Sequence, residues 1–425
     1  MPTTAYYTLG CKVNQYETEK IREEMEKRGF QTVSFDRLAD IYIINSCTVT
    51  ATADSKSRKA IRAAVHKNPK SLVVATGCYA HLRPEEIQAI PGVDLVVSNL
   101  EKDQIPDRII RHLPESAMPD PSFNSQLSTF NLRQRTRAIL KVQDGCDNFC
   151  AYCAVPLARS VIYSRPLDDV LAEAKALSEQ GFKEIVLTGI RLGKYYSKRV
   201  RLPQLIERIC DVQGIERVRL SSIEPMEVTE ELLETVARPP KVCRHLHIPL
   251  QSGDDEILRR MNRPYTREEF VALAGQAKTL IPRLGLTTDV MVGFPGETDE
   301  QFKNTIELIE EIRFSRLHVF RFSARPGTAA ETMSDRVSPT EMERRSKALI
   351  SLGRCLMQEF AERLVGQIVK VLVEGRRTKG GVLSGLTDNY VETVFEGPRN
   401  LKGRIVEVMA MRAENGRLVG ELASS

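Results

Sequence analysis

The sequence has no long uninterrupted run of apolar residues. No stretch approaches the roughly 18 apolar residues that a membrane-spanning helix needs, so we expect no membrane segment. The first ten residues, MPTTAYYTLG, lack a basic region followed by an apolar one, which argues against secretion and favours the cytoplasm. The excess of charge is also small, since 61 lysines and arginines oppose 56 aspartates and glutamates. This balance permits a nucleic-acid partner without demanding one.

The composition is that of a globular chain with several domains. Of its 425 residues, 42% are hydrophobic and 28% are charged, and at roughly 150 residues per domain the length suggests two or three. Disulfides are rare in cytosolic chains, so clustered cysteines more often bind metal or do chemistry. Six of the nine cysteines fall into two sets of three, which makes them the first candidates for a site.

The first ~100 residues alternate short apolar runs with charged stretches of helical period. Strands are expected at 5–9, 41–44, 72–75 and 93–97, and helices at 16–28 and 55–66. This βαβ order predicts a parallel sheet covered by helices. The segment 114–128 is rich in Pro, Ser, Asn and Asp, which is typical of a linker.

A second series of strands and helices follows the linker. The six strands are expected at 138–142, 184–188, 217–221, 245–250, 286–292 and 316–322, with helices such as 167–180, 254–261 and 298–312 between them. Thr298 and Gln301 form a capping box at the start of the last of these helices. Six β/α repeats predict an open partial barrel with its reactive groups at the C-terminal strand ends.

The tail of the chain has a different pattern. A charged helix at 339–364 leads into short strands separated by glycine-containing turns, which predict a small β-barrel. The fold class is therefore α/β, with an N-terminal parallel α/β domain, a central partial (β/α)6 barrel and a C-terminal all-β barrel. The expected boundaries are 1–113 for the first domain, 114–131 for the linker, 132–362 for the partial barrel and 363–425 for the small barrel.

The clearest chemical motif is a C-x3-C-x2-C run just after the first barrel strand, formed by Cys146, Cys150 and Cys153. Three thiolates can hold three irons of a [4Fe–4S] cluster and leave the fourth iron open, as catalytic metal sites do. The alternative is a structural zinc site. It is disfavoured because no fourth Cys or His lies nearby in the sequence.

A second triplet, Cys11, Cys47 and Cys78, is spread along the N-terminal domain. Each cysteine follows an apolar strand by a residue or two, and the intervals of 36 and 31 residues each match one βαβ unit. The C-terminal ends of parallel strands meet at one sheet edge, so the three thiols should converge there. The alternative is three buried core cysteines. Placement at three successive strand ends favours the other interpretation, a second cluster in which one iron has no protein ligand.

Together these motifs carry a family resemblance. The first run coupled to a partial barrel resembles the radical S-adenosylmethionine (SAM) superfamily. The two triplets together resemble the methylthiotransferase family, and the C-terminal barrel resembles its RNA-binding TRAM domain. Three segments, GCKVNQYE at 10–17, RLSSIEP at 219–225 and FSRLHVF at 314–320, are similar to the family branch that acts on tRNA threonylcarbamoyladenosine.

The resemblance implies a radical-SAM enzyme that adds a methylthio group to C2 of N6-threonylcarbamoyladenosine next to the anticodon. It implies two [4Fe–4S] clusters, SAM, a tRNA anticodon stem-loop as partner, a sulfur donor and an electron donor such as flavodoxin or ferredoxin. The other branches, which act on isopentenyladenosine in tRNA or on an aspartate of a ribosomal protein, remain alternatives. An RNA-binding protein with an electron-transfer cluster is a further one, opposed by the missing fourth cysteines.

The resemblance also suggests cofactor and substrate contacts. Expected SAM contacts are Tyr152, Thr188, Gly189, Ser222, Glu224 and Gln251. Gly189 can equally be an ordinary turn glycine, and Glu224 an ordinary solvated carboxylate. Expected substrate contacts are Asn14, Arg159 and Arg191.

Three further patterns bear on ligands. Cys243, His245 and His247 share one face of an expected strand, which invites a metal site, but the resemblance implies none and we expect them to line the barrel interior. Basic runs at 54–70 and 191–201 suit RNA phosphates or a solvated face. Tyr390 and Phe395 are the tail's only aromatic residues, and each suits either RNA stacking or the core.

Overall fold

The computed structural model describes residues 1–425 except 115–117, 119–134, 239, 377–380 and 424–425. The chain divides into two compact units. The first comprises 1–134, 144–162 and 323–331, and the second comprises 135–143, 163–322 and 332–425. The expected linker lies largely outside the described residues. No helix in the described part of the chain has the length and apolarity of a membrane-spanning segment.

The first unit is built on a five-stranded parallel sheet in the order β2-β1-β3-β4-β5. Its strands are β1 (Thr3–Thr8), β2 (Gln31–Val33), β3 (Ile41–Ser46), β4 (Leu72–Gly77) and β5 (Leu95–Val96). The parallel sheet predicted from the βαβ order is therefore confirmed. The short edge strand β2 was not predicted, because three residues with one strongly apolar side chain give no periodic signal.

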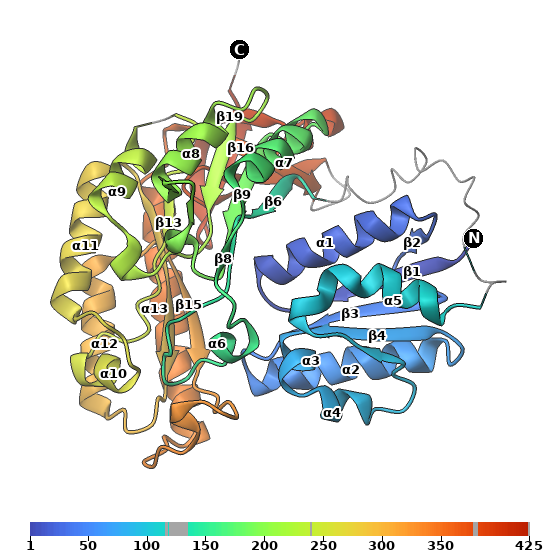
Figure 1. Cartoon of the computed structure of the whole chain (residues 1–425). Coiled ribbons are helices and arrows are strands. Elements are labelled where there is room, and N and C mark those ends of the chain that lie inside the picture. The colour runs from blue at the N-terminus through green and yellow to red at the C-terminus, as the bar shows by residue number, and fades with distance from the viewer. Residues whose placement is uncertain (115–117, 119–134, 239, 377–380, 424–425) are drawn as a thin grey trace. The chain divides into compact units, whose positions relative to one another are not determined.

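Helices cover both faces of this sheet (Figure 1). On one face, α1 (Lys12–Lys27) and α5 (Ile105–His112) pack against Ile41 and Ile43, and on the other, α2 (Ala51–Lys67) packs against Tyr42 and Ile44. All six residues of β3 are buried, since a parallel strand covered on both sides buries its alternate side chains in two cores.

The second unit contains the partial barrel. Two parallel sheets, β12-β9-β6 and β13-β14-β15, are joined by bridges between Val218 and Val242 and between Ser222 and His247. The strands are β6 (Arg137–Lys141), β9 (Glu184–Thr188), β12 (Arg217–Leu220), β13 (His245–His247), β14 (Gly285–Val292) and β15 (Arg316–Arg321). All six predicted barrel strands are present, although β13 is three residues shorter than expected, because Pro249 cannot donate a ladder hydrogen bond.

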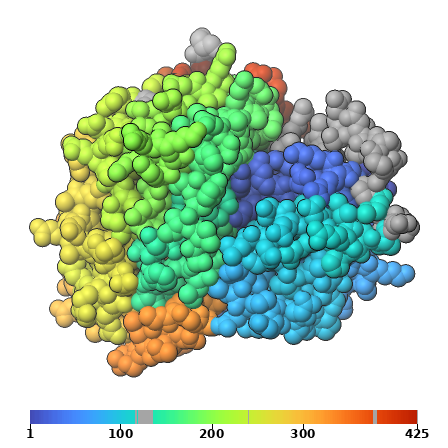
Figure 2. Space-filling view, in the orientation of Figure 1, coloured from blue at the N-terminus to red at the C-terminus, as the bar shows by residue number. Residues whose placement is uncertain are grey.

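Six helices form the outer layer of the barrel (Figure 1), and the surface of this part of the chain is coloured from green to yellow in Figure 2. They are α7 (Leu167–Glu179), α8 (Leu202–Cys210), α9 (Glu230–Ala237), α10 (Asp255–Arg260), α11 (Arg267–Leu280) and α12 (Asp299–Ile312). The predicted capping box is confirmed: the Thr298 side chain accepts from the Gln301 backbone, and the Gln301 side chain accepts from the Thr298 backbone.

On β13 and β14, apolar side chains that face the helices alternate with polar side chains. Leu246, Leu286 and Val290 belong to the large core shared with the helices. The alternate residues on the same strands, including His247 and Asp289, therefore point away from that core. The inner face can thus present titratable groups to a ligand.

The chain ends in α13 (Pro339–Glu362) and a closed five-stranded barrel in the order β16-β17-β18-β20-β19. Its strands are β16 (Ile368–Arg376), β17 (Val382–Thr387), β18 (Glu392–Glu396), β19 (Ile405–Glu414) and β20 (Arg417–Leu422). Phe395 is buried in its core. The predicted small β-barrel is therefore confirmed, and Phe395 is one of its core residues.

A loop of the small barrel is held by two arginines of β12. Arg219 donates to Glu184 Oε1 at 2.7 Å and to the carbonyl oxygens of Thr387 and Asp388 at 2.9 and 3.0 Å. Arg217 donates to the carbonyl oxygens of Leu386 and Lys370 at 3.1 and 3.0 Å. Glu184 is completely buried, so this anchor is an interior ion cluster.

Candidate active site

Cys11, Cys47 and Cys78 lie at the carboxyl ends of β1, β3 and β4, which are neighbours in the sheet. Cys11 is the N-cap residue of α1, Cys47 directly follows β3, and Cys78 begins the short helix α3 (Cys78–Leu82). The convergence expected from the sequence spacing is what the parallel register produces, because all three strands run in the same direction.

The three thiols are close enough to influence one another. Burial raises the pKa of Cys47 to about 11, and the neighbouring Cys78 and Cys11 add to this rise. A Cβ atom at Gly10, which precedes Cys11, would lie 3.0 Å from Cys47 Sγ. A thiol loses its proton when it binds a metal, so these buried thiols can serve as thiolate ligands once a cluster is bound.

Gly77, which precedes Cys78, lies against the backbone next to Cys47. Its φ is +99°, and an added Cβ would lie 2.2 Å from the Ser46 carbonyl oxygen, next to Cys47. We expect Gly77→Ala to displace the Cys47 loop and, if each triplet holds the cluster expected from the sequence, to reduce the bound iron of the reconstituted protein by about half. Iron and acid-labile sulfide per chain would measure this loss.

Gly181→Ala is the matched control for this prediction. Gly181 also has a positive φ, +91°, but an added Cβ there would meet nothing within 4 Å. The control therefore carries the backbone strain, about 1–3 kcal/mol, without the collision. Equal iron contents in the two variants would show that Gly77 does not shape the Cys47 loop.

The second triplet lies on a tight loop in the same unit. Cys146 N–H donates to the Arg159 carbonyl at 3.0 Å, Cys153 N–H donates to the Cys150 carbonyl at 3.0 Å, and Asn148 N–H points to Cys146 Sγ at 3.3 Å. Gly145 has a φ of +82°, and a Cβ there would lie 2.1 Å from the Val161 carbonyl oxygen. The loop that presents the three sulfurs is thus closed by its own backbone.

Arg159 lies in the interior of the first unit, at the end of this loop. It is 4% exposed, and its guanidinium donates to both carboxylate oxygens of Glu17 at 2.8 Å, to Asn14 Oδ1 at 2.8 Å and to Asp144 at 2.8 and 2.9 Å. Burial opposes the charge, but Glu17, Cys78 and Asp144 outweigh it and hold the pKa of Arg159 well above its ordinary value.

Glu17 and Asn14 belong to α1, which starts at Cys11. Asn14 also donates to the carbonyls of Leu9 and Ser46 at 2.8 and 3.0 Å, so one side chain holds the loops of two cysteines. Lys102 is a second buried cation, 2.5 Å from Glu17 Oε2 and 3.2 Å from Asn45 Oδ1. The polar network around Glu17 therefore joins the two cysteine loops.

Asn99 makes a second connection between the loops. Its amide donates to the Ala158 carbonyl at 2.9 Å and lies 3.6 Å from Cys78 Sγ. The sequence had not singled out Lys102 or Asn99. Glu17 lies in the segment 10–17, whose family resemblance was its only signal in the sequence, because its partner Arg159 is 142 residues away.

The donor sets fit two iron–sulfur clusters that each leave an iron open. All nine cysteines are free, and the three outside the triplets, Cys210, Cys243 and Cys355, belong to the second unit. The unit that holds both triplets therefore contains six cysteines, three for each cluster, and no seventh cysteine that could complete either set. The buried cations Arg159 and Lys102 suit the negative charge of a thiolate-bound cluster.

The expected SAM contacts of the second unit lie at barrel strand ends. Thr188 ends β9, and a Cβ at the following Gly189 would lie 2.9 Å from Gln143 Oε1, so the chain does pass closely there. Ser222 is exposed after β12, and Gln251 adopts a φ of +64° and pairs with Val290. Their contact with SAM stays a prediction, as does that of Tyr152 in the first unit.

Glu224, the sixth expected SAM contact, is half-buried and pairs with Arg263, whose side chain is almost fully buried. It is therefore not the freely solvated carboxylate that was the alternative. Arg263 was missed because nothing in its local sequence distinguishes it from a surface arginine.

The three expected substrate residues are all buried. Asn14 and Arg159 are 1% and 4% exposed within the network described above. Arg191 is 8% exposed, and its Nε donates to Glu227 Oε1 at 2.8 Å. Their contact with substrate stays a prediction, but each already has a structural role in its unit.

The basic run at 54–70 lies mainly on α2. Lys56, Lys59 and Arg62 are exposed, whereas Arg58 donates to the Tyr79 hydroxyl at 2.6 Å. Such an exposed stripe can contact phosphates of any nucleic acid. Tyr390 is engaged, since its ring stacks on His245 with centroids 4.5 Å apart.

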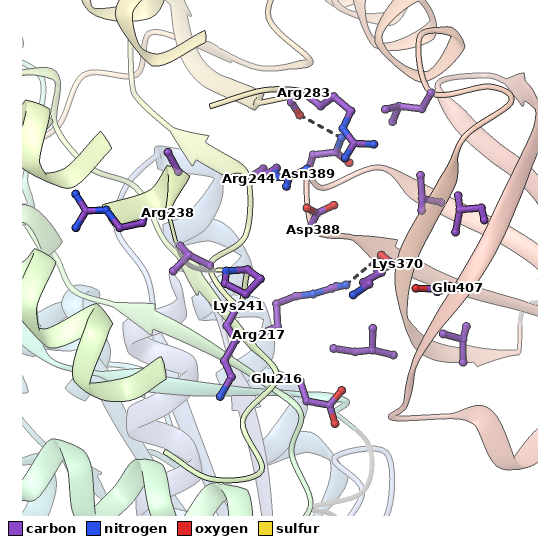
Figure 3. A pocket seen from close by; sticks show the side chains of 18 residues that line it. Glu216, Arg217, Arg238, Lys241, Arg244, Arg283, Lys370, Asp388, Asn389 and Glu407 are labelled. Atoms are coloured by element: carbon purple, nitrogen blue, oxygen red, sulfur yellow. Dashed lines mark hydrogen bonds between the residues drawn. The ribbon is translucent and has the colours of Figure 1, made fainter. Parts of the chain in front are cut away.

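A basic cavity of about 680 Å³ lies in the second unit, between the half-barrel and the small barrel (Figure 3). Six basic and three acidic side chains line it: Arg217, Arg238, Lys241, Arg244, Arg283 and Lys370, with Glu216, Asp388 and Glu407. The excess of positive charge suits an anionic ligand such as a phosphate backbone.

Three family models match the chain. Residues 140–309 match the radical SAM superfamily, 3–98 match the uncharacterized protein family UPF0004, and 362–423 match the TRAM domain. The first match covers the C-x3-C-x2-C run, and the second covers the other cysteine triplet.

Similar curated proteins extend over nearly the full length. The chain is 41% identical to the threonylcarbamoyladenosine tRNA methylthiotransferase MtaB of Bacillus subtilis, with 97% of this chain and 94% of that protein covered. It is 39% identical to the Thermotoga maritima protein of the same name, covering 97% and 96%. It is also 34% identical to a tRNA-2-methylthio-N(6)-dimethylallyladenosine synthase of Pelotomaculum thermopropionicum, covering 98% and 96%.

Among solved structures, the radical SAM methyltransferase TsrM of Kitasatospora setae has a TM-score of 0.58 at 15% identity. The match covers 90% of this chain and 81% of that one. At this identity the likeness concerns the fold alone.

Proposed function

This chain belongs to the radical SAM tRNA methylthiotransferase family, and from that membership we propose that it adds a methylthio group to C2 of N6-threonylcarbamoyladenosine next to the anticodon of tRNA. The observation that carries the proposal is the 41% identity to a protein of that named activity over 97% of this chain. Both cysteine triplets lie within the matched length.

The radical SAM domain implies one [4Fe–4S] cluster and SAM, and we assign the cluster to Cys146, Cys150 and Cys153. When bound, it supplies an electron and an open iron for SAM. Cys11, Cys47 and Cys78 would hold the second cluster and thus the sulfur to be transferred. A radical route suits the substrate, because an aromatic C–H is not acidic enough for a side-chain base.

Buried side chains of this chain would hold the two cysteine loops at a fixed position relative to each other. Arg159 is bonded to Glu17 and Asn14 on α1 and follows the second triplet by six residues. Radical transfer needs its reacting groups placed to within a fraction of an ångström, away from water. A buried charged network supplies such rigidity, because moving any member leaves another charge unpaired.

The proposed reaction needs three partners: the tRNA, an electron donor and a sulfur donor. The small barrel, which matches the TRAM domain, and the exposed cations of α2 would bind the tRNA anticodon stem-loop through its phosphates. An electron donor such as flavodoxin or ferredoxin would reduce the first cluster, and a sulfur donor would renew the second.

The nearest rival substrate is N6-isopentenyladenosine in tRNA. One observation favours it: this chain is 34% identical to two tRNA-2-methylthio-N(6)-dimethylallyladenosine synthases, over 98% and 89% of its length. The higher identity to the threonylcarbamoyladenosine enzymes ranks it second.

Mass spectrometry of tRNA nucleosides tests the proposal. We expect cells that lack this gene to lose 2-methylthio-N6-threonylcarbamoyladenosine completely and to accumulate the unthiolated nucleoside. Expression of the wild-type chain should restore the modification. A loss of the isopentenyl nucleoside instead would assign the rival substrate, and an unchanged profile would remove tRNA as the substrate.

A further inference from the structure

The inner face of the half-barrel brings together three metal-binding side chains from neighbouring strands. They are His247 at the end of β13, Asp289 in β14 and His318 in β15. Asp289 and His318 are direct partners in the β14–β15 ladder, and Thr287, two residues before Asp289, is the partner of His247. The side chains at positions 287 and 289 share one face of β14, so the register itself sets His247 beside Asp289.

The distances match those of a coordination sphere. His247 Nε2 and His318 Nδ1 lie 3.3 and 3.2 Å from the same oxygen, Asp289 Oδ1. Ligands bound tetrahedrally to Zn²⁺ at 2.0–2.1 Å are separated by roughly 3.3 Å, so two edges of such a site are already formed. The ligand nitrogens of the two histidines lie within 4.8 Å of each other. The two imidazole rings are stacked, with their centroids 5.3 Å apart.

The neighbours of His247 orient it as in known metal sites. Its Nδ1 lies 2.9 Å from the hydroxyl of Thr287, which leaves Nε2 directed at Asp289. Ligating histidines usually have the second ring nitrogen bonded in this way, which fixes both the tautomer and the ring. The Thr287 hydroxyl also lies 3.1 Å from His245 Nε2, and the His245 ring stacks on Tyr390, so the support extends to the small barrel.

The site is charged and open on one side. Burial works against ionisation of Asp289, yet contacts with His247 and His318 hold the pKa of this carboxyl well below its usual value. The side chain of His247 is 10% exposed, that of Asp289 26% and that of His318 40%. Two histidines and one carboxylate leave coordination positions free, as in catalytic rather than structural metal sites.

This trio differs from the C-x-H-x-H pattern of the sequence. Cys243 is completely buried, and His245 is bonded to Thr287. Only His247 of the pattern takes part, because the other two ligands come from the next two strands. The six cluster cysteines are not involved.

We propose that His247, Asp289 and His318 form a site for a divalent transition-metal ion such as Zn²⁺, and that its free positions take a carboxylate of the substrate. The second half rests on the proposed function, since N6-threonylcarbamoyladenosine carries a threonyl carboxylate and hydroxyl that suit a hard, oxygen-binding position. Ser222, two residues after β12, pairs with His247, so this ligand lies at the carboxyl end of β13, on the side where barrel ligands bind, while Asp289 and His318 lie within β14 and β15.

Zinc retention by the full-length chain with its iron–sulfur clusters reconstituted tests the metal site. After incubation with ZnCl2 and gel filtration, wild type should retain roughly one zinc per chain with unchanged iron, as expected for a three-ligand site. His318→Ala and the isosteric Asp289→Asn should lose it, and Thr287→Val should bind zinc about 10–100-fold more weakly. His66→Ala removes an exposed histidine of α2 as the matched control and should retain zinc.

The same samples separate the two halves of the proposal. Zinc should strengthen binding of an anticodon stem-loop carrying threonylcarbamoyladenosine, relative to unmodified adenosine, in wild type but not in His318→Ala. No zinc in the wild type, or equal zinc in every variant, would overturn the metal site. Retained zinc without discrimination would overturn the carboxylate role alone. Loss of the proposed function would show separately, as failure of wild type to methylthiolate the modified stem-loop.

Discussion

Cys150→Ala is expected to abolish SAM cleavage, whereas Cys47→Ala should leave SAM cleavage intact and abolish only methylthio transfer. Cys150 belongs to the triplet that matches the radical SAM domain, and Cys47 to the triplet at the sheet edge of the N-terminal domain. A cluster held by three thiolates has no ligand to spare, so the loss of one should remove it. Each variant should therefore contain about half of the wild-type iron.

The measurement is a reaction of each variant with SAM, a chemical reductant and an anticodon stem-loop, followed by mass spectrometry of 5′-deoxyadenosine and of the RNA. Cys355→Ala is the matched control, since Cys355 is an exposed cysteine of α13 outside both triplets. It should behave as wild type. Methylthiolated RNA from Cys47→Ala would contradict the assignment of the sulfur-bearing cluster.

Arg159→Leu should have the second large effect, on the stability of the first unit. The change removes hydrogen bonds to Glu17, Asn14 and Asp144 and takes one of the buried cationic partners away from Glu17. Breaking a buried ion pair typically costs about 3–5 kcal/mol, because one charge remains uncompensated. We expect amide hydrogen exchange in α1 and around both cysteine loops to accelerate accordingly.

Arg259→Leu provides the comparison for this prediction. Arg259 pairs with Glu256 on the exposed face of α10, where both side chains are largely solvated. Its replacement should change exchange little, since exposed ion pairs contribute little to stability. If Arg159→Leu exchanged no faster than this control, the network around Glu17 would not be what fixes the two loops.

The sequence was sufficient for most of the strands of the two parallel sheets and for the convergence of one cysteine triplet. Strand β9 has the predicted bounds, and Cys11, Cys47 and Cys78 converge because strand direction and spacing are local properties of βαβ units. Parallel strands with two-sided burial also give strong apolar runs, such as that of β3. These features depend only on residues close together in the chain.

The side-chain networks could not be predicted in the same way. Arg159 and Glu17 lie 142 residues apart, and their contact depends on tertiary packing. The His247 cluster shows the same limit: the local pattern pointed to Cys243 and His245, whereas strand register supplied Asp289 and His318. Arg191 was expected to contact the substrate, and only the structure reveals its pairing with the buried Glu227.

Arg217 and Arg219 tie the small barrel to the half-barrel, so the small barrel cannot be removed from the chain without disturbing the rest of the unit. Both guanidiniums donate to backbone carbonyls of β16, β17 and the loop that follows β17, and both pair with the buried Glu184. Deleting the last ~60 residues would therefore act as a core mutation of the half-barrel. What resembles a detachable RNA-binding module in sequence is a structural component of the enzyme, and an exchange between homologues would have to carry the two arginines with it.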